Sequence, residues 1–413
     1  TPPTPRRRKV RRRGRGTEVE LETGHFALPA DHPLRQWGRR GLVFGGAALA
    51  LALVGAVLDL EQFLRSYLIG YVFWAGIALG SMAILMIHHV AGGAWGAVIR
   101  RPLESAVRTL PLLAILFVPI FLGVHHLYEW AHADVVAHDP ILAEKAPYLN
   151  VAFFRLRAVF YFAIWIAVAH YLGRWSIEQD RDATSNAGRR LQFLSQGGLL
   201  LYGLTVTFAA VGWMMSLEPH WFSTIYGLLV MGGQGLAAFA FAIPITAALM
   251  RGPGEKVIGP SQLRDLGSFL LAFVMIWGYL SLSQLLIIWS ANLPEEISWY
   301  LHRSTGGWRT VGMSLVVFHF AVPFMVLLSR GVKQRAPVLA RVALALVLMR
   351  FVEVFWLLAP SWETKGFSLH WLDVVVPVGI GGLWLWFFVR QLARFPVLPI
   401  GDPALPAAGG AHE

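Results

Sequence analysis

The chain of 413 residues contains no cysteine. Cysteine thiolates hold iron–sulfur clusters, attach c-type haem covalently, bind structural zinc and act as catalytic nucleophiles. The sequence therefore excludes cysteine-ligated iron–sulfur clusters, covalently attached haem, thiolate metal sites and catalytic thiols within this chain.

Charged residues are also scarce, at 14% of the chain, whereas 56% of the residues are hydrophobic. A soluble domain of this size is about a quarter charged. The apolar residues form continuous runs of about twenty, which match the length of a membrane-spanning helix and exclude the alternating pattern of a barrel. The sequence predicts an all-α integral membrane protein with about ten transmembrane helices.

Ten windows meet the test of length and apolarity. They run over 41–60, 66–90, 106–124, 151–174, 191–214, 222–250, 263–290, 307–329, 336–359 and 370–391. The predicted organisation is a basic N-terminal tail over 1–40, a transmembrane domain over 41–391 and a flexible C-terminal tail over 392–413.

The charges that are present are unevenly distributed. The chain has 35 Lys and Arg against 24 Asp and Glu, and a dense basic run lies between Arg6 and Arg15. Lys and Arg also favour the connections after the even-numbered windows, so the positive-inside rule predicts that these connections and both termini are cytoplasmic. The basic run is interpreted as a topology signal that touches anionic lipid or a partner, in preference to a nucleic-acid site.

The second half of the chain places several polar residues at similar depth in neighbouring predicted helices. Arg350 and Glu353 are three residues apart, so they share a helix face and can pair. The further candidates for this group are His319, Gln234, Gln284 and Ser281. If the group is the centre of a proton path, Asp265 and Ser268 are the candidates for the inner half of that path. Ionisable residues at bilayer depth indicate a proton path or a quinone head-group site, and the competing interpretation is a static network that holds the helices together.

Histidines and glycines in the other predicted helices have simpler interpretations. His88 or His89 opposite His170 would satisfy the depth needed for b-type haem, but no helix carries two well-spaced interior histidines. The outward cluster of His125, His126 and Glu129 is interpreted as solvated rather than metal-binding. Gly76 and Gly80 form a GxxxG pattern, which indicates close helix packing. Pro323 lies one turn beyond His319 and predicts a distortion of the eighth helix.

Two predicted outward connections carry a family resemblance. SLEPHWFSTIYG runs from Ser216 to Gly227, and SQLLIIWSANLPEEISWY runs from Ser283 to Tyr300. Together they resemble the F subunit (ActF) of alternative complex III, a bacterial quinol:cytochrome c oxidoreductase, over residues 35–395. The resemblance implies an NrfD/PsrC-like fold, in which helices two to five and six to nine form two four-helix bundles and the first and last helices are peripheral.

The resemblance also implies a function and a set of partners. The chain would be a membrane subunit of a respiratory quinol:electron-acceptor oxidoreductase in the bacterial inner membrane, acting in proton conduction and assembly without its own redox cofactor. Its partners would be a homologous quinol-binding membrane subunit, haem-c subunits and an iron–sulfur subunit, with menaquinol as electron donor. The outward connections would form their docking surface through Glu218, Trp221, Glu295, Glu296 and Trp299. The alternatives are a quinone-binding subunit and a secondary transporter, and no catalytic, cofactor-binding or metal-binding residue is assigned.

Overall fold

A computed structural model describes residues 26–182, 184–252, 254–255, 257–363 and 366–405. Every regular element within these residues is a helix, and 10 helical segments are long and apolar enough to cross a membrane. The chain is therefore an all-α, multi-pass membrane protein, as the composition predicts. The basic run between Arg6 and Arg15 lies outside the described residues.

The spans and their connections follow in chain order. The spans are α1 (Pro33–Leu58), α2 (Leu60–Ala91), α3 to α5 (Ala94–Val107, Leu110–Leu116, Val118–Leu122), α9 (Val151–Arg181), α10 (Ala187–Trp213), α11 (Tyr226–Leu249), α12 (Pro260–Ala291), α14 with η4 and α15 (Trp308–Ser314, Leu315–Ala321, Val322–Leu328), α17 (Ala336–Leu358) and α18 (Leu372–Leu392). The short connecting helices are α6 (Val124–Leu127), η2 (Glu129–Ala131), α7 (Ala133–His138), α8 (Pro140–Lys145), η3 (Met215–Leu217), α13 (Pro294–His302), α16 (Arg330–Gln334) and η5 (Ala359–Ser361).

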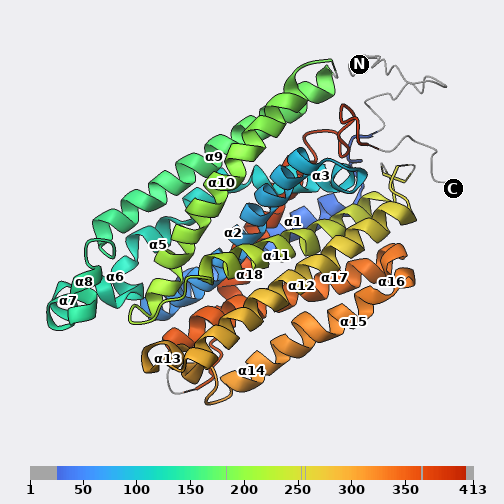
Figure 1. Ribbon diagram of the computed structural model, residues 1–413. Coiled ribbons are helices and arrows are strands. Elements are labelled where there is room, and N and C mark those ends of the chain that lie inside the picture. The colour runs from blue at the N-terminus through green and yellow to red at the C-terminus, as the bar shows by residue number, and fades with distance from the viewer. Residues whose placement is uncertain (1–25, 183, 253, 256, 364–365, 406–413) are drawn as a thin grey trace, which may run out of the picture.

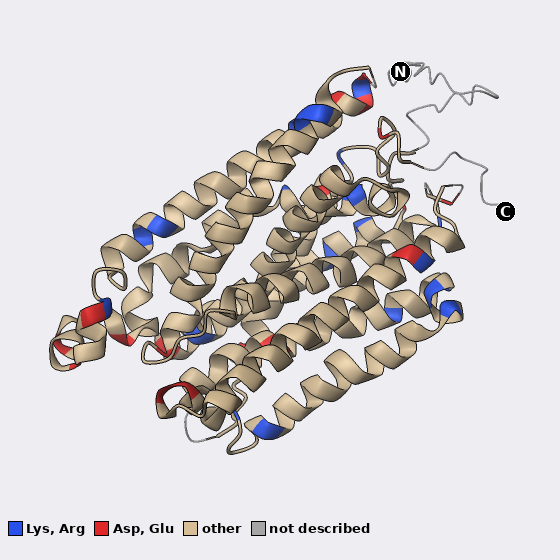
Figure 2. Cartoon of the chain, viewed as in Figure 1, with Lys and Arg blue, Asp and Glu red and all other residues tan. Residues whose placement is uncertain are grey.

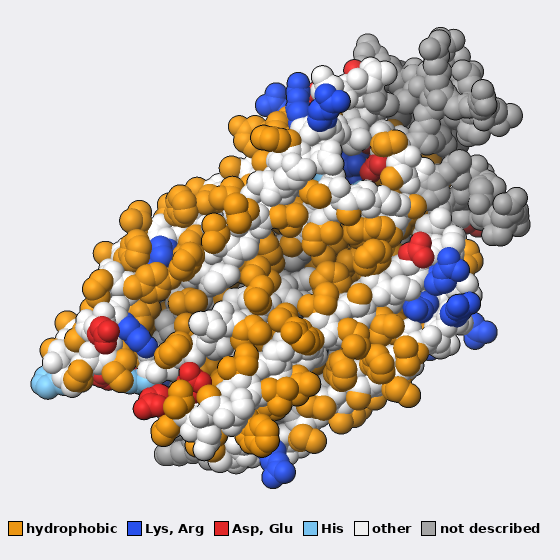
Figure 3. Space-filling view, viewed as in Figure 1, with side chains coloured by type: hydrophobic (Ala, Val, Ile, Leu, Met, Phe, Trp, Pro, Cys, Tyr) orange, Lys and Arg blue, Asp and Glu red, His pale blue; other side chains and the backbone are white. Residues whose placement is uncertain are grey.

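The spans lie side by side, and their ends define two sides of the molecule (Figure 1). Phe26 and Val397 are hydrogen-bonded through their backbones on one side, here called the terminal side. Helices α7, α8 and α13 lie on the other, here called the opposite side (Figure 1). Charged residues gather toward these two sides (Figure 2), and hydrophobic side chains cover the visible face between them (Figure 3). This distribution matches a membrane protein whose apolar middle region contacts lipid.

The centre of the molecule is formed by α2 and α11. Within the most apolar part of each span, 94% of the residues of α2 and 83% of those of α11 are buried, against 17% for α1. Helix α2 packs against α3, α10, α11 and α18, whereas α11 also packs against α12 and α17. Gly80 permits the contact between the two central helices, because a Cβ atom there would lie 2.0 Å from the carbonyl oxygen of Gln234.

Two spans are interrupted where proline removes a backbone donor. The third span breaks into α3, α4 and α5, and Pro111 and Pro119 lie in the first turns of the last two. The eighth span contains a π-helical turn, Leu315–Ala321, that ends directly before Val322 and Pro323. The predicted distortion near Pro323 is therefore confirmed.

The ends of the transmembrane domain differ from the predicted boundaries. Helix α1 begins at Pro33, inside the predicted 1–40 tail, and the third span begins at Ala94 rather than near residue 106. The sequence predicts a flexible tail after α18, but Val397, Leu398 and Leu405 are buried against the helices. Apolar side chains within this Pro-rich segment cause the difference, since they are removed from water by packing on the terminal side.

Candidate functional site

The first candidate site is the Glu353 cluster, formed by Trp277, His319, Arg350 and Glu353 inside the membrane domain. On α17 the Arg350 Nη1 and Glu353 Oε2 atoms are 2.5 Å apart, and His319 Nε2 is 3.5 Å from the same carboxylate oxygen. The indole Nε1 of Trp277 donates a 2.7 Å hydrogen bond to Glu353 Oε1. All four side chains are buried. The structure thus joins Arg350, Glu353 and His319 as the sequence predicts, and adds Trp277.

The π-helical turn of the eighth span positions His319. His319 lies within this wider turn, and its imidazole contacts Trp277 of α12 and Glu353 of α17. The imidazole meets the Trp277 ring edge-on, with ring centroids 4.4 Å apart. Its Nδ1 atom makes no hydrogen bond to any described residue. A buried imidazole beside a carboxylate can accept or pass on a proton.

Gln234 lies beside this cluster but belongs to a separate contact. Its Oε1 atom accepts a 2.7 Å hydrogen bond from the Tyr202 hydroxyl of α10. The adjacent Gly233 faces the Arg350 guanidinium, and a Cβ atom there would lie 2.1 Å from Nη1. Gln234 also lines a small, mostly apolar cavity between α2, α10 and α11. The α11 residue that faces Arg350 is therefore Gly233, and not Gln234, which the sequence predicts as a member of this group.

The remaining predicted members of the proton path lie elsewhere. Gln284 accepts a 3.1 Å hydrogen bond from Ser223 and lies 3.5 Å from the Tyr300 hydroxyl, on the opposite side. Ser281 is partly exposed on α12. The expectation that Gln284 surrounds Glu353 is therefore wrong, because the side chain is directed toward the connections beyond the helix end.

The predicted inner half is separated from the Glu353 cluster. Asp265 is half exposed and lies 3.8 Å from Arg264, and Ser268 accepts a 3.1 Å hydrogen bond from Lys333. Ser268 precedes Trp277 by nine residues on α12, which is about 14 Å along a helix. Leu270 and Val274 are buried between them. Asp265 and Ser268 therefore lie on the terminal side and do not touch Glu353.

The two segments that carry the family resemblance pack against each other on the opposite side. The rings of Trp221 and Trp299 stack with centroids 4.9 Å apart, and Trp221 Nε1 donates a 3.0 Å hydrogen bond to the Glu296 carbonyl. Both tryptophans are buried, so within this chain they join the segments instead of presenting a docking face. Glu295 is exposed and Glu296 half-buried, and Glu218 is engaged in an ion pair with Arg303.

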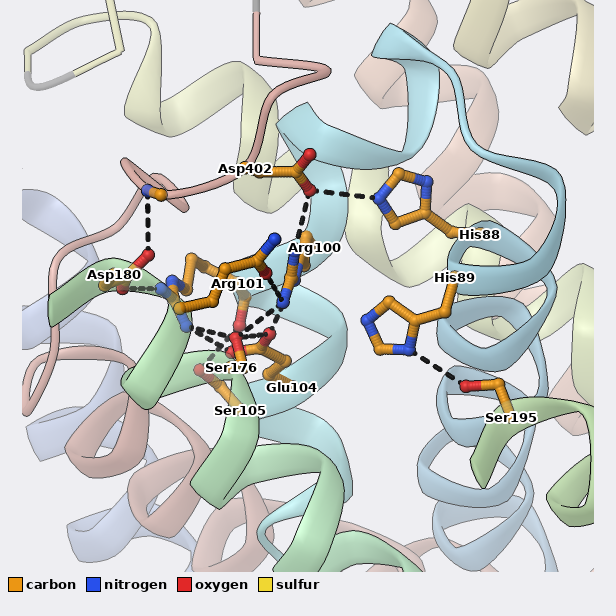
Figure 4. Close-up of polar contacts among 12 residues, drawn as sticks. His88, His89, Arg100, Arg101, Glu104, Ser105, Ser176, Asp180, Ser195 and Asp402 are labelled. Carbon is orange, nitrogen blue, oxygen red and sulfur yellow. Dashed lines mark hydrogen bonds and ion pairs between the residues drawn. The ribbon is translucent and has the colours of Figure 1, made fainter. Parts of the chain in front are cut away.

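The second candidate site is the Glu104 cluster, a charge network on the terminal side (Figure 4). Glu104 of α3 accepts hydrogen bonds from Arg100 (2.9 Å), Arg101 (2.5 Å) and Arg108 (3.2 Å). The hydroxyl of Ser176 on α9 donates to the same carboxylate and accepts from Arg100 and Arg101. Arg100, Arg101 and Glu104 are each at most 2% exposed. Charges this deeply buried are tolerated when groups of opposite charge lie beside them.

Two further carboxylates balance the three arginines. Asp180 of α9 pairs with Arg101, and Asp402 of the C-terminal segment lies 2.7 Å from Arg100 and 3.4 Å from His88. Figure 4 shows Asp402 reaching from the C-terminal segment between Arg100 and His88. The cluster therefore contains as many carboxylates as guanidinium groups, which is the arrangement expected of a stable buried network.

The C-terminal segment is held to this cluster by a close backbone contact as well as by charge. The Gly401 N–H donates to Asp180, and a Cβ atom at Gly401 would lie 2.0 Å from the Gln179 carbonyl oxygen. Burial disfavours the Asp402 carboxylate, but the hydrogen bond with His88 and the charge of Arg100 outweigh burial and hold the pKa of Asp402 below its ordinary value. Since the folded pKa is lowered, Asp402 stabilises the docked segment at neutral pH and loses this effect only in acid.

Sequence reasoning missed the Glu104 cluster because it assigned Arg100 and Arg101 to a connection between helices. Helix α3 begins directly after Gly92 and Gly93, both of which have positive φ. The available signal is the spacing of Arg100 and Arg101 before Glu104, at four and three residues, which is typical of ion pairs on a helix.

In the sequence, His88 or His89 opposite His170 would satisfy the depth needed for ligands of a b-type haem, and the structure shows what each of these side chains contacts. His88 is engaged with Asp402 and His89 with Ser195, while His170 is exposed on α9. Among the described residues, no group of three or more His, Cys, Asp or Glu side chains is arranged to hold a metal ion.

The fold and the two clusters define a polytopic helical membrane protein with ionisable side chains in its interior. No protein-family model matches the sequence, and no curated protein matches it. The function is therefore inferred from the clusters and from the residues that carry the resemblance.

Proposed function

We propose that this chain is a membrane subunit of a respiratory quinol:electron-acceptor oxidoreductase of the alternative complex III type. It conducts protons and supports assembly, and it contributes no redox centre of its own. The observation that carries the proposal is the Glu353 cluster, in which a carboxylate, a guanidinium and an imidazole meet among apolar helices. The resemblance of the segments around Glu218 and Trp299 supports the assignment to this type of complex.

The chemistry of the Glu353 cluster favours proton transfer. An ionised carboxylate inside a membrane is costly unless it is paired, and Arg350 supplies the pair. Protonation of Glu353 would release Arg350, so a change of one proton alters the ion pairing on α17 and the contact of Glu353 with His319 of the eighth span. His319 supplies a second group that can hold the proton. Moving one charge against 100 mV costs about 2.3 kcal/mol, so quinol oxidation elsewhere in the complex must drive the transfer.

The orientation of the chain follows from its basic residues. The terminal side faces the cytoplasm, because Lys and Arg gather there and retained basic segments favour that side. The opposite side faces the periplasm of a bacterial cell and meets haem-c and iron–sulfur subunits through the exposed Glu295 and the half-buried Glu296. The homologous quinol-binding subunit lies beside it in the membrane.

A tagged copy of the chain, purified in mild detergent from its native membranes, is expected to bring haem-containing proteins with it. The measurement is the haem spectrum and the subunit composition of the purified material. Quinol-dependent reduction of an acceptor should accompany the same fraction. A chain that emerges alone and catalyses substrate uptake in vesicles would instead support the secondary-transporter alternative.

Replacement of Glu353 with Gln is expected to lower proton translocation per quinol by about tenfold or more, while quinol oxidation persists. Glutamine keeps the size of the side chain and can still accept the Trp277 hydrogen bond, but it cannot carry the proton. The measurement is proton release by vesicles that contain the intact complex. The matched control is Glu144→Gln, which changes an exposed carboxylate on the opposite side. An assembled Glu353→Gln complex with normal translocation would show that the ion pair is only structural.

A further inference from the structure

A second ion pair, Glu218 with Arg303, lies beyond the Arg350–Glu353 pair toward the opposite side of the molecule. Arg303 Nη1 and Glu218 Oε1 are 2.7 Å apart, and the Arg303 guanidinium carbon lies 3.7 Å from the centre of the Trp299 ring. Arg303 is 2% exposed and the Glu218 side chain 13% exposed. Removing these two charges from water is costly, which suggests that the pair has a role beyond keeping the surface soluble.

The second pair is attached to the helix that carries Glu353. Arg303 Nη2 donates a 2.7 Å hydrogen bond to the carbonyl of Leu357, and the Ser361 hydroxyl donates a 2.9 Å hydrogen bond to Glu218 Oε1. Leu357 follows Glu353 by four residues, which is about 6 Å along a helix. The Glu218–Arg303 pair therefore lies directly beyond the Arg350–Glu353 pair toward the opposite side.

Tyr226 is a further buried polar side chain in this region. Its phenol is buried at the start of α11 and is coupled electrostatically to Arg303 and Glu218 and, more weakly, to Arg350 and Glu353. A phenol hydroxyl can accept and donate a hydrogen bond at the same time. Polar groups near the two pairs are thus the Tyr226 phenol and the Leu357 carbonyl, which accepts a hydrogen bond from Arg303, in contrast to the buried Leu270 and Val274 between Trp277 and Ser268.

Glu218 is also in contact with a group that reaches solvent. His302 Nδ1 lies 3.3 Å from Glu218 Oε2, and the His302 side chain is 47% exposed. The charged and titratable groups around Glu218 are Arg303 and His302 of the α13 region and Tyr226 of α11. Histidine side chains exchange protons with water near neutral pH. His302 is therefore a suitable exit group for a proton held by Glu218.

We propose that Glu218 receives protons from Glu353 and releases them through His302 on the opposite side, an inference that rests on the proposed proton-conducting function. In the transfer step Glu353 loses its proton and pairs again with Arg350, while the Glu218 carboxylate becomes neutral and its pairing with Arg303 weakens. In the release step the proton passes to the His302 imidazole and then to water, and Glu218 pairs again with Arg303. Glu218 thus acts inside the chain, in addition to its place in a segment that carries the family resemblance.

The test uses the intact complex in vesicles, with proton release on the opposite side measured beside quinol oxidation. Glu218→Gln is expected to lower proton release by about tenfold while the complex assembles and oxidises quinol, because Gln retains a hydrogen-bonding oxygen but carries no proton. Glu218→Asp is expected to restore part of the release, and Glu144→Gln, an exposed carboxylate on the same side, is expected to leave it unchanged. Full release by an assembled Glu218→Gln complex would overturn the proposal.

Two further variants keep the result decisive. His302→Ala changes an exposed side chain, and it is expected to slow proton release without affecting subunit composition. If Glu218→Gln prevents assembly, unchanged release by His302→Ala overturns the route. Glu353→Gln is measured in parallel, because normal translocation in that variant contradicts the proton-conducting function itself. Loss of translocation in Glu353→Gln with full release in both Glu218→Gln and His302→Ala contradicts only the exit route.

Discussion

Replacement of Glu104 with Ala is expected to lower the free energy of unfolding by about 3–5 kcal/mol, the typical loss when one member of a buried ion pair is removed. Glu104 is 1% exposed and is shared by Arg100, Arg101 and Arg108. After the change, three buried or nearly buried guanidinium groups would have one carboxylate too few. The uncompensated charge, rather than the lost volume, accounts for most of the expected effect.

Chemical unfolding in detergent micelles, followed by tryptophan fluorescence, measures this difference. The matched control is Glu61→Ala, since Glu61 is exposed and pairs with Arg65 one turn away on α2. An exposed pair of this kind contributes less than about 1 kcal/mol. Equal stability of the Glu104 and Glu61 variants would contradict the view that the Glu104 cluster holds α3, α9 and the C-terminal segment together.

Replacement of Gly80 with Ala is expected to destabilise the protein by about 3 kcal/mol, at the upper end for an overpacked interior. The added Cβ atom would lie 2.0 Å from the carbonyl oxygen of Gln234 and 2.5 Å from its carbonyl carbon. Both atoms belong to the α11 backbone, so no side-chain rotation relieves the clash. The two central helices would have to separate, and the Tyr202–Gln234 hydrogen bond would be disturbed with them.

Gly76→Ala is the matched control for this prediction. A Cβ atom at Gly76 would lie 3.5 Å from Gln234 Cγ, an ordinary contact, and Gly76 lines the small cavity between α2, α10 and α11. Both variants gain the same helix propensity of about 1 kcal/mol. The difference between their unfolding free energies in detergent therefore isolates the contact with α11. Similar values for the two variants would contradict the close approach of α2 and α11 at Gly80.

The sequence predicted the membrane domain and part of the Glu353 cluster. Arg350 and Glu353 could be paired because both lie on one helix, and His319 because it lies at a similar depth. Trp277 was missed since a tryptophan in an apolar helix gives no sign of the atom that its indole N–H will face. Gln284 was misplaced because similar depth does not determine the direction in which a side chain points.

The Glu104 cluster illustrates a second limit of prediction from the sequence. The apolar run of the third span begins only near residue 106, since the charges of Arg100, Arg101 and Glu104 interrupt the signal that marks a span. A helix that begins before its apolar run, as α3 does at Ala94, leaves no such apolar signal at its start. The same reasoning applies to the C-terminal segment, whose Pro-rich composition conceals the apolar residues that dock it.

The sequence by itself determined the ten helical spans, because the length of an apolar run is local and a backbone in lipid must satisfy its hydrogen bonds within the segment. Only the tertiary structure decided which buried charges meet, since Arg100 and Asp402 are 302 residues apart and Glu218 and Arg303 belong to different connections. Such pairs depend on the rotation and spacing of packed helices. These are fixed by close contacts such as that of Gly80 with Gln234, which no local pattern specifies.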